Sequence, residues 1–389
     1  MNVLLVFTLI IGFMIVYHHA LYPLLLRWFA SMQADTDVSL NENQQSDADL
    51  PTIELILPAY NEASVIAQKI RNIAELDYPA NKLTVTLIGD GCSDNTMQIA
   101  NELAQDANLA HLNLNICEFK QNRGKIAVIN QAITNSQSEI VAMSDISALI
   151  NRDGLKLAAR RFQNAKVAVV NSSYHFANYS SPGEQAYWQY QSKIKQMESK
   201  TGSVIGAHGA LYFFRRQLFT ELRPDTINDD FVLPMSIVAK GYLAVHEAEI
   251  KAVELECVQP DSNNSRRKRI AAGNLQQAVR LRHLISPSFK GVAFNFLSCK
   301  VLRVFMPPCL ILFYLASLVL ASQYISFVLL AIGQSIFYAL ALYQHHLNAT
   351  ERSAKMLKKL IGVIYYFAAG HWYSFVGMTE YLLKKQRSW

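Results

Sequence analysis

Two acidic side chains stand where apolar stretches of the sequence end, and a lysine stands where a helix is expected to begin. Asp90 and Asp145 each close a β-type run, and Lys125 follows Arg123-Gly124 at the start of an apolar-periodic segment. We expect the two carboxylates at neighbouring strand ends, where they can hold a ribose, a base edge or a divalent cation. Mg²⁺ or Mn²⁺ needs few protein carboxylates when phosphates supply the other oxygens. A lysine at a helix N-terminus can neutralise a phosphate. The alternative is that Asp90 and Asp94 only cap turns and that Lys125 is solvated.

A second acidic pair precedes another expected helix. Asn228-Asp229-Asp230-Phe231 stands directly before the apolar run Val232–Ala239. An N-cap followed by acidic first-turn residues is a common structural reason for this pattern. A carboxylate at a helix N-terminus that is aimed into a cleft can instead act as a general base and deprotonate a sugar hydroxyl. Both interpretations stay open from these residues alone.

Four consecutive cations, Arg266-Arg267-Lys268-Arg269, form the most basic stretch of the chain. Such a stretch is typical of a solvated or membrane-facing patch. The competing interpretation is catalytic, because a diphosphate leaving group needs cationic stabilisation.

Small and aromatic residues supply two further candidate contacts. Gly206-Ala207-His208-Gly209-Ala210 precedes an expected strand, Leu211–Phe214, and its small residues allow a bulky ligand to approach the backbone. We take His208 as a ligand contact, with a turn histidine or a metal ligand as the alternatives. Trp188 belongs to the expected helix Glu184–Lys200, where aromatic side chains could stack on a sugar ring or pack in a core or membrane interface.

Strands that alternate with helices must position these side chains. The expected strands are Thr52–Leu57, Leu83–Ile88, Leu112–Phe119 and Glu139–Met143, and the helices between them are Ala63–Leu76, Thr96–Ala107 and Ile126–Thr134. This order predicts parallel βαβ units in an α/β doubly wound sheet, whose ligands bind beyond the C-terminal strand ends. Four polar groups follow the predicted strands: Pro58–Glu62, Asp90–Thr96, Asn122–Lys125 and Ser144–Ser147.

Composition places the chain at a membrane. Of 389 residues, 51% are hydrophobic and only 17% are charged, and the formal net charge is +6. These values exclude a disordered chain and argue against an ordinary cytosolic enzyme. The net charge is too small to indicate a nucleic-acid partner, but it suits a protein lying against an anionic leaflet.

Apolar segments near both ends predict the membrane regions. We expect an N-terminal transmembrane helix in residues 1–30, for which a cleaved signal peptide is the alternative, and a polar linker in 31–50. We then expect a globular domain in 51–284, an interfacial segment in 285–303 and a C-terminal membrane region in 304–389. That last region holds two spans, Val304–Ser322 and Tyr324–Tyr343, and a third segment, Ile361–Leu383, that spans or lies in the interface. The flanking basic residues predict that the globular domain is cytoplasmic. The five cysteines contain no CxxC pair and suggest neither a zinc site nor a disulfide framework.

Six motifs in order resemble those of the family 2 glycosyltransferases with the GT-A fold. They are PAYNE (Pro58–Glu62), GDGCSDNT (Gly89–Thr96), NRGKIAVIN (Asn122–Asn130), SDIS (Ser144–Ser147), GAHGALYFFRR (Gly206–Arg216) and NDDFVLP (Asn228–Pro234). The resemblance covers roughly residues 53–276 and is nearest to the membrane-embedded branch with cellulose, hyaluronan and poly-N-acetylglucosamine synthases. It implies a mixed, mostly parallel sheet flanked by helices, and a nucleotide-sugar donor, above all a UDP-sugar.

The resemblance also assigns roles to residues. It implies that Asp230 is the catalytic base of an inverting transfer and that Asp229 supports it. It implies that Asp145 engages the nucleotide and a Mg²⁺ or Mn²⁺ ion. With these roles, the donor-binding set that we expect is Pro58, Glu62, Asp90, Lys125, Asp145, Ser147 and Arg269. The residue types and spacing described above add Gly206, His208 and Trp188 as expected donor or acceptor contacts.

Two departures from the family pattern bear on the reaction. The second aspartate of the family's Asp-x-Asp is Ser147 here, which is a weaker and neutral ligand. The Gln-x-x-Arg-Trp element of the synthases is missing, and Arg269-Ile270 stands in the comparable place without the aromatic platform of processive enzymes. We therefore expect an inner-membrane β-glycosyltransferase that acts on a lipid-linked or growing exopolysaccharide acceptor, with other polysaccharide-export proteins as further partners. The alternatives are transfer of one sugar to a lipid (a polyprenyl phosphate or a glycolipid) and a non-catalytic component of a polysaccharide machine that binds nucleotide sugars.

Overall fold

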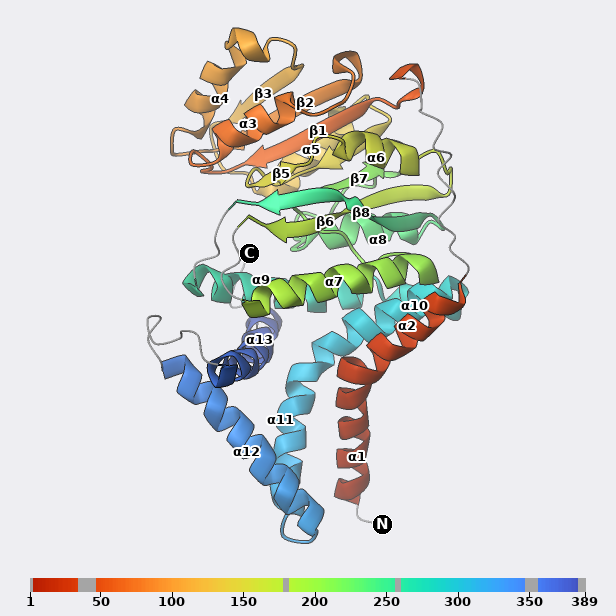
Figure 1. Ribbon diagram of the computed structural model, residues 1–389, viewed down its shortest axis with the longest axis vertical. Helices are drawn as coiled ribbons and strands as arrows, with labels where there is room; N and C mark the ends of the chain where they lie inside the picture. The colour runs from red at the N-terminus through yellow and green to blue at the C-terminus, as the bar shows by residue number, and fades with distance from the viewer. Residues whose placement is uncertain (1–2, 34–46, 178–181, 256–259, 347–355, 384–389) are drawn as a thin grey trace.

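The core of the globular domain is an eight-stranded mixed sheet in a computed structural model that describes residues 3–33, 47–177, 182–255, 260–346 and 356–383. The strand order is β3-β2-β1-β4-β7-β6-β8-β5 (Figure 1). The strands are β1 (Ile53–Ala59), β2 (Leu83–Asp90), β3 (Leu114–Phe119), β4 (Ile140–Met143), β5 (Ala148–Ile150), β6 (Val167–Phe176), β7 (Tyr212–Arg215) and β8 (Leu243–Glu254). Strand β1 pairs in parallel with β2 and β4, whereas β7 runs antiparallel to β4 and β6. The predicted mixed, mostly parallel sheet is confirmed.

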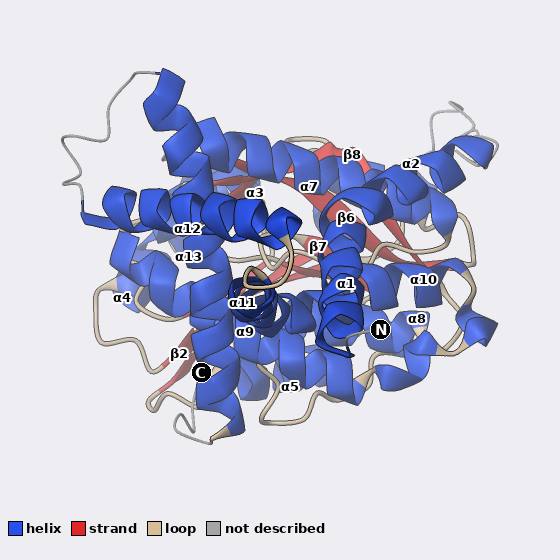
Figure 2. Ribbon diagram, turned by 90° about the horizontal axis from the view of Figure 1, so that it is seen from below, coloured by secondary structure: helices blue, strands red, loops and turns tan. Residues whose placement is uncertain are grey.

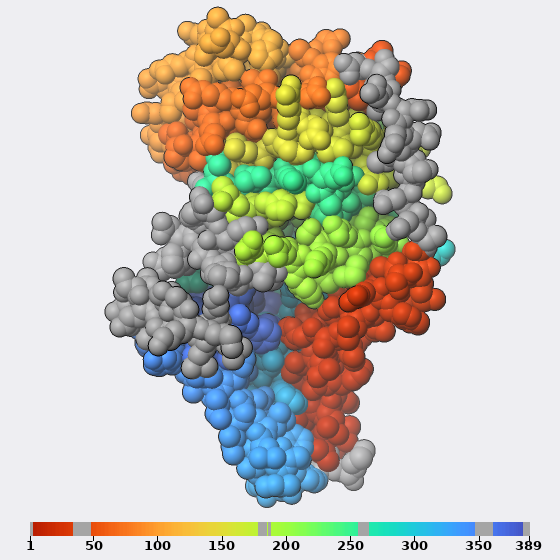
Figure 3. Space-filling model, viewed as in Figure 1, coloured from red at the N-terminus to blue at the C-terminus, as the bar shows by residue number. Residues whose placement is uncertain are grey.

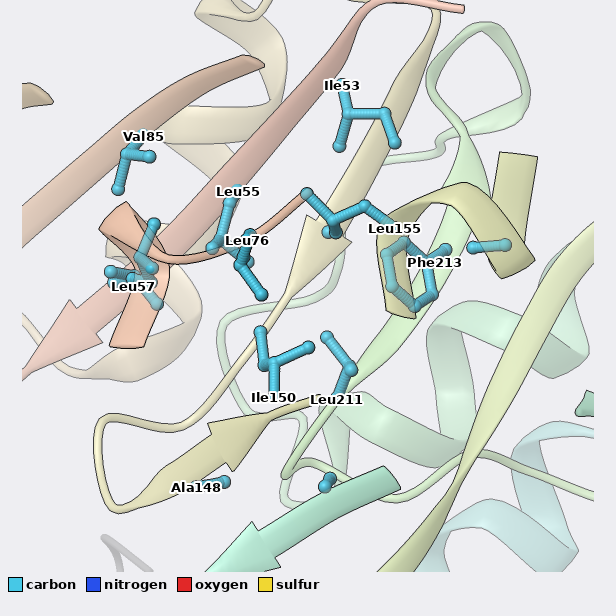
Figure 4. Close-up of a cluster of buried hydrophobic side chains, with 14 of the residues drawn as sticks. Ile53, Leu55, Leu57, Leu76, Val85, Ala148, Ile150, Leu155, Leu211 and Phe213 are labelled. Carbon is cyan, nitrogen blue, oxygen red and sulfur yellow. The ribbon is translucent and has the colours of Figure 1, made fainter. Parts of the chain in front are cut away.

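Side chains that alternate along β1 build two apolar cores, one on each face of the sheet. Leu55 and Leu57 pack with Phe213 on one face (Figure 4), and Ile56 packs with Phe214 on the other. A strand buried on both faces is expected in the middle of a parallel sheet. This explains why Leu55-Ile56-Leu57 is a continuous apolar run.

Helices cover both faces of this sheet and begin close to the strand ends. They are α3 (Ile66–Ala74), α4 (Thr96–Ala104), α5 (Lys125–Asn135), α6 (Gly154–Arg161) and α8 (Asp229–Val238). The predicted helices after the first three strands are therefore confirmed, although their ends differ by a few residues. The sequence patterns did not predict β5, β6, β8 and α6. Strand β6 is hard to recognise because it buries a polar run, Asn171-Ser172-Ser173.

Two long helices, α7 (Pro182–Thr201) and α9 (Pro260–Arg280), lie between the sheet and the helices below it (Figure 1). The prediction of a helix over Glu184–Lys200 is confirmed. The basic stretch Arg266–Arg269 lies within α9, so this layer carries four consecutive cations.

Three helices are long and apolar enough to cross a membrane within the described part of the chain: Val3–Met32, Gly291–Leu320 and Ile325–His346. The first joins α1 (Val3–Val16) to α2 (Tyr22–Met32) through a π-helical bend at Tyr17–Leu21. The second joins α10 (Gly291–Asn295), a π-helical turn (Phe296–Val301) and α11 (Leu302–Leu320), and the third is α12 (Ile325–His346). In Figure 2, viewed from below, α1, α11 and α12 lie in front of the sheet. The space-filling view shows them as a narrow stem below a broader domain (Figure 3).

Parts of these helices belong to the interface with the catalytic region. Tyr22 and Leu26 of α2 are buried against Ile194 of α7. Residues 285–303 were expected to form a separate interfacial segment. The second candidate span instead begins at Gly291, so much of that segment belongs to one continuous helix.

Helix α13 (Met356–Leu382) covers the predicted segment Ile361–Leu383 and is not one of the three candidate spans. It packs against α9, where a side chain on Gly377 would collide with the backbone of Lys268. The Nζ of Lys268 also lies 3.0 Å from Oε1 of Glu380. These contacts favour the interfacial alternative for this segment.

A buried cation fixes the turn that follows β4. Lys69 of α3 is fully buried, and its Nζ donates to Oγ of Ser144 at 2.7 Å and to the carbonyl of Ala148. The Ser144 hydroxyl donates in turn to the carbonyl of Ala210, 2.7 Å away, which ties this turn to the segment before β7. Burial lowers the pKa of Lys69 to about 7, although Asp145 and Glu254 act in the opposite direction.

Replacing Lys69 should therefore change how stability depends on pH. A lysine whose pKa falls to about 7 on folding binds its proton less tightly in the folded state, so stability rises with pH between about 7 and 10.4, by at most about 1.4 kcal/mol per pH unit. We expect Lys69→Met to lose this rise when the thermal unfolding of the solubilised chain is measured from pH 7 to pH 9. Lys166→Met, which alters an exposed lysine, is the control and should keep it. An unchanged pH dependence in Lys69→Met would contradict the buried-cation assignment.

Candidate active site

The ends of β2, β1 and β4 bring the first candidate residues together. Asp90 ends β2, Pro58 lies near the end of β1, and Asp145 follows β4. We expected Asp90 and Asp145 on neighbouring strands, but β1 lies between β2 and β4. The two carboxylates therefore flank the end of the central strand.

Asp90 holds the loop that leads into α5. Its buried carboxylate accepts hydrogen bonds from the backbone N–H groups of Arg123 and Gly124, both at 2.8 Å. Gly91 has a φ of +68°, and a side chain there would collide with the backbone of Asn122. Asp90 thus fixes the backbone from which Lys125 projects.

Lys125 lies among three carboxylates. Its Nζ is 3.1 Å from Oδ1 of Asp145 and 3.8 Å from Oδ2 of Asp229, and Asp230 lies close enough to interact electrostatically. Desolvation by the surrounding protein lowers the pKa of Lys125, but the three carboxylates outweigh this and raise it above its ordinary value. Desolvation likewise raises the pKa of Asp145, and Lys125 more than reverses this shift. Lys125 and Asp145 are each about 40% exposed, so a ligand can reach both.

Asp229 and Asp230 form the first turn of α8. Oδ2 of Asp230 accepts a hydrogen bond from the N–H of Gly209 at 3.1 Å, and its carbonyl accepts one from Ala207 at 2.8 Å. Burial and the neighbouring Asp229 raise the pKa of Asp230 to about 6. A carboxylate with this pKa is largely ionised at pH 7 and is a stronger base than an ordinary aspartate.

His208 packs into an aromatic group beside Asp145. Its ring stacks on Tyr174 with a centroid distance of 3.8 Å and meets the edge of Trp188 at 5.2 Å. Burial and Arg266 lower the pKa of His208 to about 3, so the imidazole is neutral. Its Nδ1 accepts a hydrogen bond from the Ala210 N–H, which assigns the ring proton to Nε2. Both His208 and Trp188 thus lie close to the candidate donor site.

Gly206 allows the segment before His208 to run close to α8. Its φ is +77°, and a side chain there would collide with the ring of Phe231. The close approach brings the backbone of this segment to Asp230. Gly206 therefore has a structural reason for its identity in addition to the predicted ligand contact.

The four consecutive cations of α9 divide between two directions. Arg267 lies over the ring of Tyr366 at 4.4 Å, and Lys268 pairs with Glu380, so these two face α13. Arg266 interacts electrostatically with Asp145, and Arg269 with Asp230. Residues three apart share one face of a helix, which explains the division. The predicted residue Arg269 lies by the candidate base, and Arg266, one turn away, lies by the candidate donor carboxylate.

The remaining predicted residues contribute through their backbones. The N–H of Glu62 donates to Oγ1 of Thr96 at 2.7 Å, and the carbonyl of Ser147 accepts from Leu255 at 2.9 Å. Ser147 is a partly buried residue, and Asp145 lies two residues before it. Glu62 and Ser147 thus shape the loops around the strand ends.

The described residues contain no group of three His, Cys, Asp or Glu side chains that could hold a metal ion by themselves. Asp145 offers one exposed carboxylate, which fits a hard divalent cation when a bound diphosphate and water supply its other oxygens. Asp145 is therefore the residue that would hold such an ion.

Some residues at the site were not expected from the sequence. Lys69 lies beneath the Asp145 turn, and Tyr212 of β7 is fully buried with a hydroxyl that has no hydrogen-bond partner within the described part of the chain. Asp229 and Asp230 both interact electrostatically with that tyrosine. In the sequence, Tyr212 stands in the expected strand directly after the glycine-rich segment Gly206–Ala210. That place next to a candidate ligand contact is the signal that could have identified it.

Comparison with known proteins agrees with this geometry. Residues 54–223 match the family model described as Glycosyl transferase family 2. A beta-monoglucosyldiacylglycerol synthase of Trichormus variabilis is 29% identical over 197 residues, which are 49% of this chain and 42% of that protein. A poly-beta-1,6-N-acetyl-D-glucosamine synthase of Staphylococcus aureus is 25% identical over 218 residues, which are 54% of this chain and 51% of that protein. The matches thus span about half the length of these curated relatives.

One solved structure shares the fold along almost the whole chain. The mannosyltransferase PcManGT from Pyrobaculum calidifontis, solved in complex with GDP-Man and Mn²⁺, has a TM-score of 0.71 and 23% sequence identity, and the match covers 97% of this chain and 99% of that one. The expected GT-A fold is confirmed. Residues 54–223 thus match glycosyl transferase family 2, and the sheet with its converging strand ends has the fold of the solved mannosyltransferase.

Proposed function

We propose that this protein is a membrane glycosyltransferase that moves a sugar from a UDP-sugar, with inversion, to an acceptor at the membrane surface. The observation that supports this most strongly is the position of Lys125, between Asp145 on one side and Asp229 on the other. Lys125 and the partly exposed carboxylate of Asp145 can bind a donor diphosphate. They lie next to Asp230, whose carboxylate can serve as a base.

In the proposed reaction Asp230 takes the proton of the acceptor hydroxyl. Its Oδ2 accepts the Gly209 N–H, so Oδ1 is the atom that would receive the proton. The acceptor oxygen then displaces the diphosphate in one step, which inverts the anomeric carbon. Lys125, Arg266 and Arg269 stabilise the charge that develops on the departing UDP. A divalent cation bound by Asp145, Mg²⁺ or Mn²⁺, would supply further charge stabilisation to the diphosphate.

We propose a lipid-linked acceptor and an inner-membrane location with the catalytic domain in the cytoplasm. Three candidate spans support a membrane location, and the flanking basic residues favour the cytoplasmic side. The two relatives described above make a glycolipid and a polysaccharide, so both a single lipid acceptor and a growing exopolysaccharide agree with the match. The absence of a Gln-x-x-Arg-Trp element favours transfer of one sugar. Polysaccharide-export proteins are proposed partners for the polymer alternative.

Replacing Asp230 by asparagine should abolish most of the transfer. The substitution keeps the shape of the side chain but removes the base, and loss of a general base typically costs about 10²–10⁴-fold in rate. The measurement is UDP release from a panel of UDP-sugars by membranes that contain the full chain, together with analysis of the product.

Asp106→Asn is the matched control, because Asp106 caps a remote turn and asparagine caps equally well. This variant should keep the activity of the native chain. Full activity in Asp230→Asn would refute the assignment of the base, and absence of UDP release from the native chain with every UDP-sugar would favour the non-catalytic alternative.

Asp145 should link UDP binding to a divalent metal. We expect UDP to bind the native chain at least tenfold more tightly with Mn²⁺ than with a chelator, as measured by calorimetry. In Asp145→Asn this difference should disappear, because the only proposed protein ligand is lost. A metal effect that survives in Asp145→Asn would show that the metal is held elsewhere.

A further inference from the structure

A second set of cations lies on the membrane side of Asp230. Lys195 belongs to α7, while Lys300 and Arg303 belong to the helix Gly291–Leu320 and are one turn apart on it. None of the three is part of the candidate donor site. Lys195 interacts electrostatically with both Lys300 and Arg303, so the three lie near one another where α7 meets this candidate span. Figure 1 shows α7 above the helix that continues into α11.

Two of these cations border the residue that follows the candidate base. The Nζ of Lys195 donates to the carbonyl of Gly206 at 2.9 Å, and Gly206 packs against the ring of Phe231. The Nζ of Lys300 lies 4.8 Å from the centroid of the same ring. Asp230 also interacts electrostatically with Lys195. The candidate base thus has Lys125 on its donor side and Lys195 on its membrane side.

The nearby carboxylate of Glu198 interacts electrostatically with Lys195 but forms no ion pair with it. Glu198 is buried, and its two oxygens accept hydrogen bonds from neutral donors, the Tyr22 hydroxyl at 3.3 Å and the Ile205 N–H at 3.1 Å. Burial raises the pKa of Glu198, which favours its uncharged form. Among the described residues, neither Lys195 nor Lys300 has a carboxylate within 4.0 Å. Partly buried cations without a paired carboxylate are costly, so an anion from outside the chain would stabilise them.

The N-terminal helix closes the other side of this region. The hydroxyl of Tyr17 and Nδ1 of His18 lie 2.8 Å and 2.9 Å from the hydroxyl and carbonyl oxygens of Ser298. Ser298 is in the same turn as Lys300. The cations therefore lie where two candidate membrane helices meet the catalytic region, a position that a lipid headgroup could reach.

We propose that Lys195, Lys300 and Arg303 bind a phosphate group carried by a lipid and hold that lipid beside Asp230 as the acceptor. The acceptor role depends on the proposed function, but the binding of a lipid phosphate does not. The proposal narrows the acceptor class to anionic lipids and distinguishes it from a neutral diacylglycerol.

The test measures lipid binding to the full chain in detergent, separately from catalysis. The probes are short-chain phosphatidic acid, a diacylglycerol with the same chains, and inorganic phosphate. We expect phosphatidic acid to bind at least tenfold more tightly than either other probe, and Lys300→Gln and Arg303→Gln each to weaken its binding at least tenfold. Lys193→Gln, which alters an exposed lysine of α7, is the matched control and should bind phosphatidic acid as the native chain does.

Each outcome decides the proposal. Equal binding of phosphatidic acid and diacylglycerol, or native affinity in both glutamine variants, would overturn the phosphate site. Equal binding of inorganic phosphate and phosphatidic acid would overturn the lipid assignment. UDP affinity, measured on the same preparations, reports whether the donor domain is folded. Lipid binding that persists in a chain unable to release UDP from UDP-sugars would refute the proposed function but not this site.

Discussion

The candidate site depends on one ammonium group that lies among three carboxylates. Asp145, Asp229 and Asp230 come from two different elements, and like charges at close range repel unless a cation is shared between them. Lys125 supplies this cation, at 3.1 Å from Asp145 and 3.8 Å from Asp229. Its position follows from Asp90, which holds the two backbone N–H groups just before α5. Through Asp90 and Lys125, the end of β2, the turn after β4 and the start of α8 meet at one site.

The layer formed by α7 and α9 extends this arrangement toward the membrane. Arg266 and Arg269 turn one face of α9 to the carboxylates, and Arg267 and Lys268 turn the other face to α13. Helix α9 therefore faces both the carboxylates of the candidate site and α13, which is not one of the three candidate spans.

Sequence patterns predicted the parallel strands and the residues at their ends, because parallel pairing brings strand ends to one edge of a sheet. They did not predict Lys69 or Lys195, because a lysine on an amphipathic helix ordinarily indicates a solvated face, and only the packing shows it to be buried. Arg266 and Arg269 face the carboxylates, whereas Arg267 and Lys268 face α13. This difference depends on which face of the helix each residue occupies, and four consecutive basic residues in a sequence do not show that. The sequence did not decide between a span and an interfacial helix for α13, because Glu380 and its apolar neighbours fit both. The partner of that glutamate, Lys268, is distant in the chain, so the sequence did not show the ion pair.

The affinity for UDP of Lys125→Met, compared with the native chain by calorimetry on the solubilised protein, tests the role of the shared cation most directly. The account predicts binding at least tenfold weaker, which corresponds to about 1.4 kcal/mol, because the variant loses the charge that faces the diphosphate. Lys120→Met removes an exposed lysine close by in the chain and should bind UDP as the native chain does. Native affinity in Lys125→Met would contradict the account.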